Sequence, residues 1–165
     1  PWSEVTSRWP QATERVMAAG DHVNLDIIGA VDGYHFDVLR TAVAGPATER
    51  QQRLLAALAS VQTALLQAVR PGTTVKELFA VAAAAADRHG FGNRLGPLLG
   101  HGIGLETVES PVLFPDTDAV LAPGMVLCIE PTLHIPGEAA VSVEDELVVR
   151  PHGIERLTHL PHLPA

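Results

Sequence analysis

The feature that most restricts the fold of this chain is an Asp-Gly pair placed between two apolar runs. Asp32 and Gly33 separate residues 22–30 from residues 34–43, and both runs contain β-branched side chains. An Asp-Gly pair in this setting favours a tight turn between two antiparallel strands. A Gly-Pro pair at residues 45–46 then ends the second strand. The sequence therefore predicts that regular structure begins with a β-hairpin.

The predicted hairpin carries one aspartate in each arm, Asp26 and Asp37. Side chains alternate between the two faces of a strand, so the length of the loop decides whether these carboxylates share a face. With the Asp-Gly pair as a two-residue turn, Asp37 pairs with Ile28, one same-face step from Asp26. With a four-residue loop at residues 30–33, the two aspartates are directly opposite. Either even loop brings the carboxylates together, whereas an odd loop would separate them.

Two carboxylates on one face of a sheet repel each other unless a positive charge lies between them. Leaving either of them buried and unpaired would cost several kcal/mol, an order-of-magnitude figure. A divalent cation between Asp26 and Asp37 would remove this cost. The alternative is that one aspartate is exposed or forms an ion pair with Arg40.

Two helices are predicted after the hairpin. Residues 48–51 and 74–77 both fit the capping-box pattern, a threonine followed three positions later by glutamine or glutamate. Apolar side chains then recur at helical spacing in the first segment, and the second has an alanine-rich face that ends at Gly90. The sequence therefore predicts helices over residues 48–70 and 74–89.

The remaining pattern completes an α+β fold class. Residues 1–19 have no clear period and predict a loop that leads into a short helix, and the glycine-rich segment 98–105 is irregular. Two later apolar runs, residues 125–131 and 140–149, predict further strands. Strand pairs with two long helices between them indicate an α+β layer. A chain of 165 residues has the usual length of one domain, so we expect a single domain over residues 1–165.

Composition excludes several classes of partner. The net charge of -8 offers no basic stripe that could follow a phosphate backbone, so we expect no nucleic-acid partner. No apolar stretch reaches the ~18 residues that a membrane helix needs, so we expect no membrane association. The one cysteine, Cys128, permits no disulfide within the chain and behaves as a small buried hydrophobe in most proteins. A reducing, cytoplasmic location is therefore the expectation.

Three further residues have side chains that can coordinate a metal ion. His101 lies among glycines, which let the backbone come close and leave a ring nitrogen free to reach a metal ion. Glu130 ends an apolar run before a proline, and Glu144 interrupts another apolar run. Glutamates in such places are unusual without partners. Taken singly, a structural histidine and two solvated or ion-paired carboxylates are the more common explanation of such residues.

The order of these motifs resembles the pita-bread metallopeptidases, the family of methionine aminopeptidase, Xaa-Pro aminopeptidase, prolidase and creatinase. The resemblance covers roughly residues 20–157 and rests on five motifs in the family's order: Gly20-Asp21-His22-Val23 leading to Asp26; Gly33-Tyr34 and Asp37 with Arg40-Thr41; HGIGLE from His101; Pro123-Gly124-Met125 leading to Ile129-Glu130-Pro131; and Val143-Glu144-Asp145 with Glu155-Arg156-Leu157-Thr158. It implies a curved antiparallel sheet backed by the two long helices.

The resemblance also implies a set of metal ligands. Asp26 would bind one metal, Asp37 and Glu144 would bridge two metals, and His101 with Glu130 would complete the second site. One nitrogen and several carboxylate oxygens suit two divalent ions of manganese, cobalt, zinc or iron(II). Glu130 takes the role of general base by resemblance, and His101 joins it as a catalytic residue.

The implied activity is that of a dinuclear metallohydrolase. It would cleave a C–N bond in a small peptide or peptide-like substrate, most like an Xaa-Pro aminopeptidase or prolidase. One alternative is a non-peptidase relative, a creatinase-like hydrolase or a lyase that acts on a small metabolite. Another is a catalytically silent pita-bread module used for binding.

The sequence departs from the family at several positions. Val108 replaces a second histidine that contacts substrate, residues 8–10 lack a further expected histidine, and Ser142 replaces an arginine of the Xaa-Pro aminopeptidase branch. His35 shares the predicted strand face of Asp37, so a substrate contact is conceivable there. The histidines of the Pro-rich tail are expected at the surface: His152, His159 and His162.

A whole domain of this family has a further N-terminal portion before the first ligand strand. We therefore expect a partial domain that forms a homodimer or associates with the missing portion. The alternative is a complete, compact variant. Missing pieces of the sheet would leave an apolar face exposed, which favours association.

Overall fold

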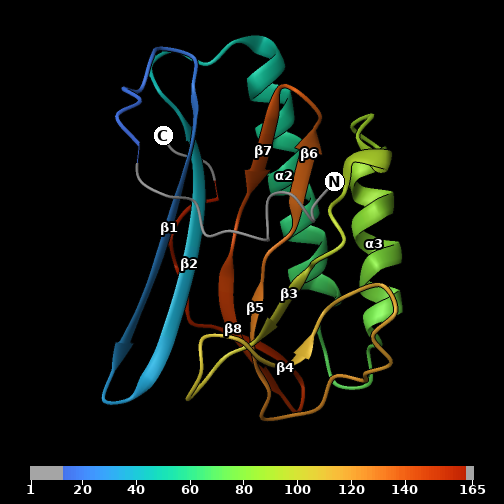
Figure 1. Ribbon diagram of the computed structural model, residues 1–165. Helices are drawn as coiled ribbons and strands as arrows, with labels where there is room; N and C mark the ends of the chain where they lie inside the picture. Colours follow the sequence, from blue (N-terminus) through green and yellow to red (C-terminus); the bar gives the residue numbers. More distant parts are fainter. Residues whose placement is uncertain (1–12, 163–165) are drawn as a thin grey trace.

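The computed structural model describes residues 13–162 (Figure 1). In chain order the elements are β1 (His22–Val31), β2 (Tyr34–Val43), α2 (Glu49–Ala68), α3 (Val75–Asp87), the 3₁₀ turn η1 (Gly92–Arg94), β3 (Gly100–Gly102), β4 (Glu109–Val112), β5 (Val126–Ile129), β6 (Thr132–Ile135), β7 (Ala139–Ser142), β8 (Asp145–Arg150) and β9 (Gly153–Arg156).

The first two strands form the predicted hairpin with a two-residue turn. Asp32 and Gly33 have φ angles of 51° and 85°, so both adopt the left-handed conformation that a tight hairpin turn requires. In the resulting register Ile28 pairs with Asp37, and Asp26 is one same-face step away. The expected shared face of Asp26 and Asp37 is therefore present, and it arises from the two-residue alternative.

The other strands form two antiparallel sheets. Five of them are ordered β4-β3-β5-β8-β9, and β6 pairs with β7. Helix α2 packs against β5, β6 and β7, and α3 packs against α2 (Figure 1). The two helices and the strands share one apolar core, which includes Leu54, Leu65, Leu78, Leu127, Ile129 and Leu147. This arrangement is α+β.

Both helices begin where the capping boxes predict. The side chains of Thr48 and Thr74 accept hydrogen bonds from the backbone N–H groups of Gln51 and Glu77, whose side chains reach back to the cap. Gly90, with φ of 78°, follows the end of α3 in the left-handed conformation. Among residues 13–162, neither helix has the length and apolar character needed to cross a bilayer.

Several strands are absent from the sequence prediction. The glycine-rich segment around His101 forms strand β3, and the run at residues 140–149 divides into β7 and β8. Strands of three or four residues contain too few positions for a period of two to be recognised, which explains the omission. Residues 13–20 form no helix, and the rest of the loop and helix expected at residues 1–19 lies outside the described residues.

One face of the hairpin is apolar and exposed. We call it the hairpin outer face; it comprises Leu25, Ile27, Val31, Tyr34 and Phe36. These side chains alternate with those of Asp26 and Asp37, which point the other way. The hairpin therefore separates a hydrophobic surface from a face that carries carboxylates.

Candidate metal centre

The five-stranded sheet has an apolar face towards the helices and a polar face on the other side. Leu127, Ile129 and Leu147 belong to the helix-covered core. Cys128 and Glu146, the alternate residues, pair with each other across β5 and β8 and point away from the helices. We call this second side the inner face of the sheet.

Three carboxylates meet where the hairpin approaches the inner face. Asp26, Asp37 and Glu144 each place an oxygen within 4.8 Å of the others, and we call them the carboxylate trio. The backbone fixes this approach, because Glu144 N–H donates to Leu39 O at 2.9 Å. The hairpin and the segment between β7 and β8 are therefore held together at the carboxylates.

Each of the two buried members of the trio has one oxygen without a hydrogen-bond partner among the described residues. Asp37 is 5% exposed and Glu144 is 1% exposed, and the oxygens concerned are Asp37 Oδ1 and Glu144 Oε1. Burial raises the pKa of Asp37, and the charge of Asp26 adds to the shift. Burial likewise raises the pKa of Glu144, together with the charges of Glu130 and Asp37. Unpartnered carboxylate oxygens in such a cluster suit a divalent cation.

A second group of possible ligands shares Glu144. His101, Cys128 and Glu144 also place one donor atom each within 4.8 Å of one another, and we call them the His-Cys-Glu trio. His101 Nδ1 lies 2.9 Å from Gly102 O, which assigns the ring proton to Nδ1. His101 Nε2, 3.7 Å from Glu144 Oε1, is then free to coordinate an ion. The carboxylate trio and the His-Cys-Glu trio therefore both offer donor atoms that suit a divalent cation.

A glycine brings β3 close enough to β5 to place His101. Gly100 has φ of +138°, and a Cβ atom built on it would lie 1.9 Å from Cys128 O. No other residue type fits this approach without a shift of the backbone. His101 and Cys128 are direct partners in the resulting strand register.

Glu130 lies near the carboxylates but belongs to neither trio. Its burial raises its pKa to about 7, with contributions from the charges of Asp37 and Asp26. A carboxyl group with this pKa exchanges protons near neutral pH. Its role as a metal ligand stays a prediction.

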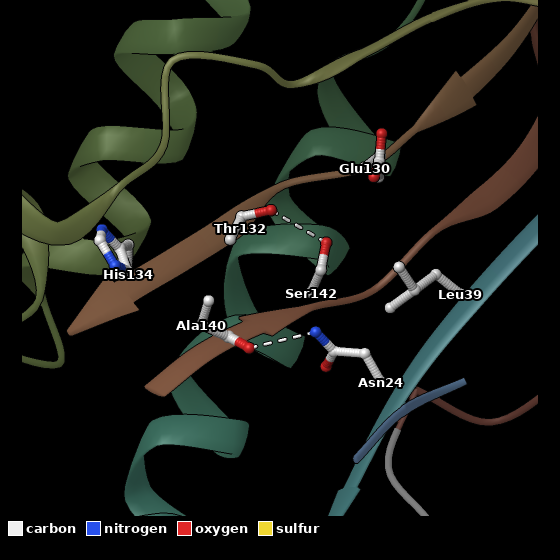
Figure 2. Close-up of a pocket in the computed structure, with 7 residues that line it drawn as sticks. All are labelled: Asn24, Leu39, Glu130, Thr132, His134, Ala140 and Ser142. Carbon is white, nitrogen blue, oxygen red and sulfur yellow. Dashed lines mark hydrogen bonds between the residues drawn. The ribbon is translucent and has the colours of Figure 1, made fainter. Parts of the chain in front are cut away.

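A pocket of about 220 Å³ opens beside Glu130 (Figure 2). Glu130 lies at one end of it, and Ser142 forms part of the wall, where its hydroxyl accepts a hydrogen bond from Thr132 at 3.0 Å. Within residues 13–162, no lysine or arginine lines it; the lining residues are Asn24, Leu39, Glu130, Thr132, His134, Ala140 and Ser142. The pocket is therefore largely neutral apart from Glu130.

Asp145, next to Glu144, lies in a different environment that sequence reasoning missed. It is fully buried, and its carboxylate accepts hydrogen bonds from Arg40 Nη2 at 2.6 Å, Gln62 Nε2 at 2.9 Å and His162 Nε2 at 2.8 Å. Burial opposes ionisation, but these partners outweigh it and hold the pKa of Asp145 at about 2. Arg156 Nη2 is also 3.5 Å from it.

This network corrects two expectations. Arg40 pairs with Asp145, so the alternative that it neutralises Asp26 or Asp37 is wrong, although the other half of that alternative is confirmed because Asp26 is exposed. His162 was expected at the surface, but its side chain is only 17% exposed because it contacts Asp145. His152 and His159 are exposed as expected. The partners of Asp145 are distant in sequence, so only Arg40 beside a motif aspartate hinted at an ion pair.

The sequence was compared with known protein families and with individual proteins. The sequence matches the metallopeptidase family M24 over residues 2–151. The chain belongs to metallopeptidase family M24. It is 34% identical over 147 residues to an Xaa-Pro dipeptidase of Pyrococcus furiosus, an alignment that covers 89% of this chain and 42% of that protein.

Two solved structures have the same fold. The prolidase of Pyrococcus furiosus superposes with a TM-score of 0.85 at 33% identity, over 91% of this chain and 44% of that one. The X-Pro aminopeptidase of Thermotoga maritima gives a TM-score of 0.86 at 28% identity, over 93% of this chain and 44% of that one. The predicted pita-bread fold and family are confirmed. This M24 chain spans less than half the length of these relatives.

Val108 is one of the positions at which the M24 chain departs from the family pattern. Val108, which occupies the place of the second histidine, is 56% exposed and offers no proton donor. His35 lies on the hairpin face of Asp37, and its Nδ1 is buried without a partner. The position at residues 8–10 lies outside the described residues.

Proposed function

We propose that this chain is the metal-binding part of a dinuclear metallohydrolase that cleaves a C–N bond in small peptides, most like an Xaa-Pro dipeptidase or aminopeptidase. The observation that supports it most is the pair of unpartnered, buried oxygens on Asp37 and Glu144. Two such carboxylates would destabilise a chain that bound nothing. The similarity to Xaa-Pro dipeptidases supports the proposed substrate class.

We propose Asp26, Asp37, His101, Glu130 and Glu144 as the metal ligands. Mixed nitrogen and oxygen donors suit two divalent ions of manganese, cobalt, zinc or iron(II). When bound, such ions supply a water that is deprotonated near neutral pH. Glu130 is the general base in this proposal, a role that the resemblance to the family implies: it would accept a proton and return it to the leaving amine.

Metal content tests the proposal directly. We expect elemental analysis to find close to two ions per chain after reconstitution with manganese and dialysis. Asp37→Asn should abolish most of this retention, whereas Asp116→Asn, which alters an exposed carboxylate in a loop, should not. Failure of the unaltered chain to retain metal would contradict the proposal. Hydrolysis of Xaa-Pro dipeptides by the loaded protein is the second measurement.

A non-peptidase activity is the second candidate, and the exposed Val108 favours it. Without a histidine at this position, a mechanism that uses an imidazole to stabilise the transition state of peptide hydrolysis is weakened. A screen of the metal-loaded protein against amidino and betaine-like metabolites, beside Xaa-Pro dipeptides, separates the two. A silent binding module is a third possibility, and for it Asp37→Ala should leave the fold no less stable.

We further propose that the hairpin outer face is buried by association. A contiguous apolar surface of this kind favours contact with a second copy of the chain or with a further part of the pita-bread fold. Light scattering across protein concentrations, with Ile27→Lys as the disrupting variant, tests self-association. A cytoplasmic setting fits a chain whose one cysteine is free and buried.

A further inference from the structure

We propose that Cys128 Sγ is an additional metal ligand, which makes the His101 side of the centre selective for thiophilic divalent ions such as zinc over manganese. The inference rests on the proposed metal centre and adds a donor outside its five ligands. On coordination the Sγ–H bond breaks, the proton leaves to solvent and a metal–sulfur bond forms, with no change of oxidation state.

The strand register places the thiol beside the imidazole. His101 and Cys128 are direct partners across β3 and β5, so both side chains project from the inner face of the sheet. Their donor atoms and a Glu144 oxygen all lie within 4.8 Å of one another. Ligands around a tetrahedral zinc ion, with bonds of roughly 2.0 to 2.3 Å, are about 3.5 Å apart, so small side-chain movements suffice to close the group.

A second observation makes this group more than a lone cysteine. Glu144 Oε1 is buried without a hydrogen-bond partner and lies 3.7 Å from His101 Nε2. The other ring nitrogen is engaged by Gly102 O, so Nε2 is the nitrogen directed at the group. Two ligand atoms thus face the same small volume as the thiol, and neither has another partner there.

Ordinary hydrophobic packing does not explain the position of the thiol. Its neighbours on β5, Leu127 and Ile129, point into the helix-covered core. Cys128 is fully buried but points to the opposite side, towards His101 and Glu144. Burial and the nearby carboxylates raise the pKa of the free thiol, so the thiolate forms here only when a bound cation offsets them; imidazole and carboxylate are the usual co-ligands of such an ion.

The two trios differ in the ions that they favour. The carboxylate trio offers only hard oxygen donors, which suit manganese and magnesium. The His-Cys-Glu trio offers sulfur, nitrogen and oxygen, which suit zinc, cobalt and iron(II). Since Glu144 belongs to both, the two neighbouring sites would differ in the ion they prefer when several ions compete.

Cobalt spectroscopy tests the ligand without measuring activity. Titration of the metal-free chain with cobalt(II) should produce a near-ultraviolet thiolate-to-cobalt charge-transfer band. The chain has one cysteine, so this band can come only from Cys128. The band should be absent in Cys128→Ser, and zinc should displace it in the unaltered chain more readily than manganese does.

The outcomes separate this inference from the proposed function. Stoichiometric cobalt binding without the band would overturn the role of Cys128 and leave the metal centre standing. Failure to bind cobalt at all would contradict the proposed function as well. In competition experiments, Cys128→Ser should weaken zinc binding by about tenfold or more while manganese binding changes little. Equal losses for both ions would overturn the proposed selectivity.

Discussion

Glu144 and Asp145 are consecutive in the chain, yet their carboxylates lie on opposite faces of the sheet. Glu144 faces two other carboxylates and has a raised pKa, whereas Asp145 faces cations and an amide on the helix side and has a pKa of about 2. Asp145 is the first residue of β8 and pairs with Ile129 of the helix-covered core, whereas Glu144 precedes the strand and its backbone bonds to the hairpin at Leu39. One carboxylate therefore stabilises the fold, and its neighbour is available for an ion.

Replacing Asp145 with Asn should strongly destabilise the protein. The change leaves Arg40 without its buried counter-charge, and removal of one partner of a buried ion pair costs about 3 to 5 kcal/mol. Urea unfolding of the metal-free protein measures the loss. The exposed variant Asp116→Asn is the matched control and should unfold like the unaltered chain. A loss below about 1 kcal/mol would show that Asp145 is not the anchor of this network.

Replacing Glu144 with Gln should have the opposite effect on the metal-free fold. Burial raises the pKa of Glu144 to about 9, so at pH 8 the metal-free fold holds a proton there that the unfolded chain releases. Gln needs no such proton, so the free energy of unfolding at pH 8 should rise by about 1 to 2 kcal/mol. Metal retention should fall in the same variant, because a bridging carboxylate is lost. Thermal unfolding with and without manganese checks both effects, and a destabilised metal-free variant would contradict the first.

The stability of the metal-free protein should fall as the pH rises through the neutral range. Glu130 has its pKa raised from 4.5 to about 7, so the folded state binds more protons than the unfolded state between these values. The free energy of unfolding then decreases with rising pH over that interval. Asp145 acts in the other direction, because its contribution is lost only as the pH falls from 3.8 towards 2. Urea midpoints between pH 4 and pH 8.5 test the trend, and bound metal should flatten it.

Gly100→Ala should displace His101 and weaken metal binding. The added Cβ would meet Cys128 O at 1.9 Å, so β3 must move away from β5. Gly72→Ala is the matched control, since its φ of +90° is also strained but nothing lies within 4 Å of the new atom. We expect the control to cost about 1 to 2 kcal/mol and Gly100→Ala clearly more. If Gly100→Ala and Gly72→Ala lost the same stability and the same bound metal, the close approach of β3 to β5 would be unimportant.

Local chemistry made part of this structure predictable. The Asp-Gly turn fixed the parity that places Asp26 and Asp37 on one face, and the capping boxes gave the first residue of each helix. These signals involve residues that are neighbours in sequence. The meeting of Glu144 with the hairpin was expected only from the family resemblance, because nothing local relates it to Asp37.

The features that escaped prediction depend on contacts between distant segments. Strand β3 has three residues and no periodicity, so its strand character comes entirely from its partners β4 and β5. The network of Asp145 joins residues from β2, α2 and the C-terminal segment. The placement of Cys128 opposite His101 likewise needed the register of two strands that are far apart in the sequence.

Gln62 connects helix α2 to both strands that lead to the carboxylates. Its Nε2 donates to Ile129 O on β5 and to Asp145 Oδ2 on β8, each at 2.9 Å. A fully buried amide cannot give up these bonds to water while the helix stays in place. Loss of α2 and loss of the ligand arrangement should therefore occur in a single cooperative step, so no partly unfolded form would keep its ion after the helix has gone.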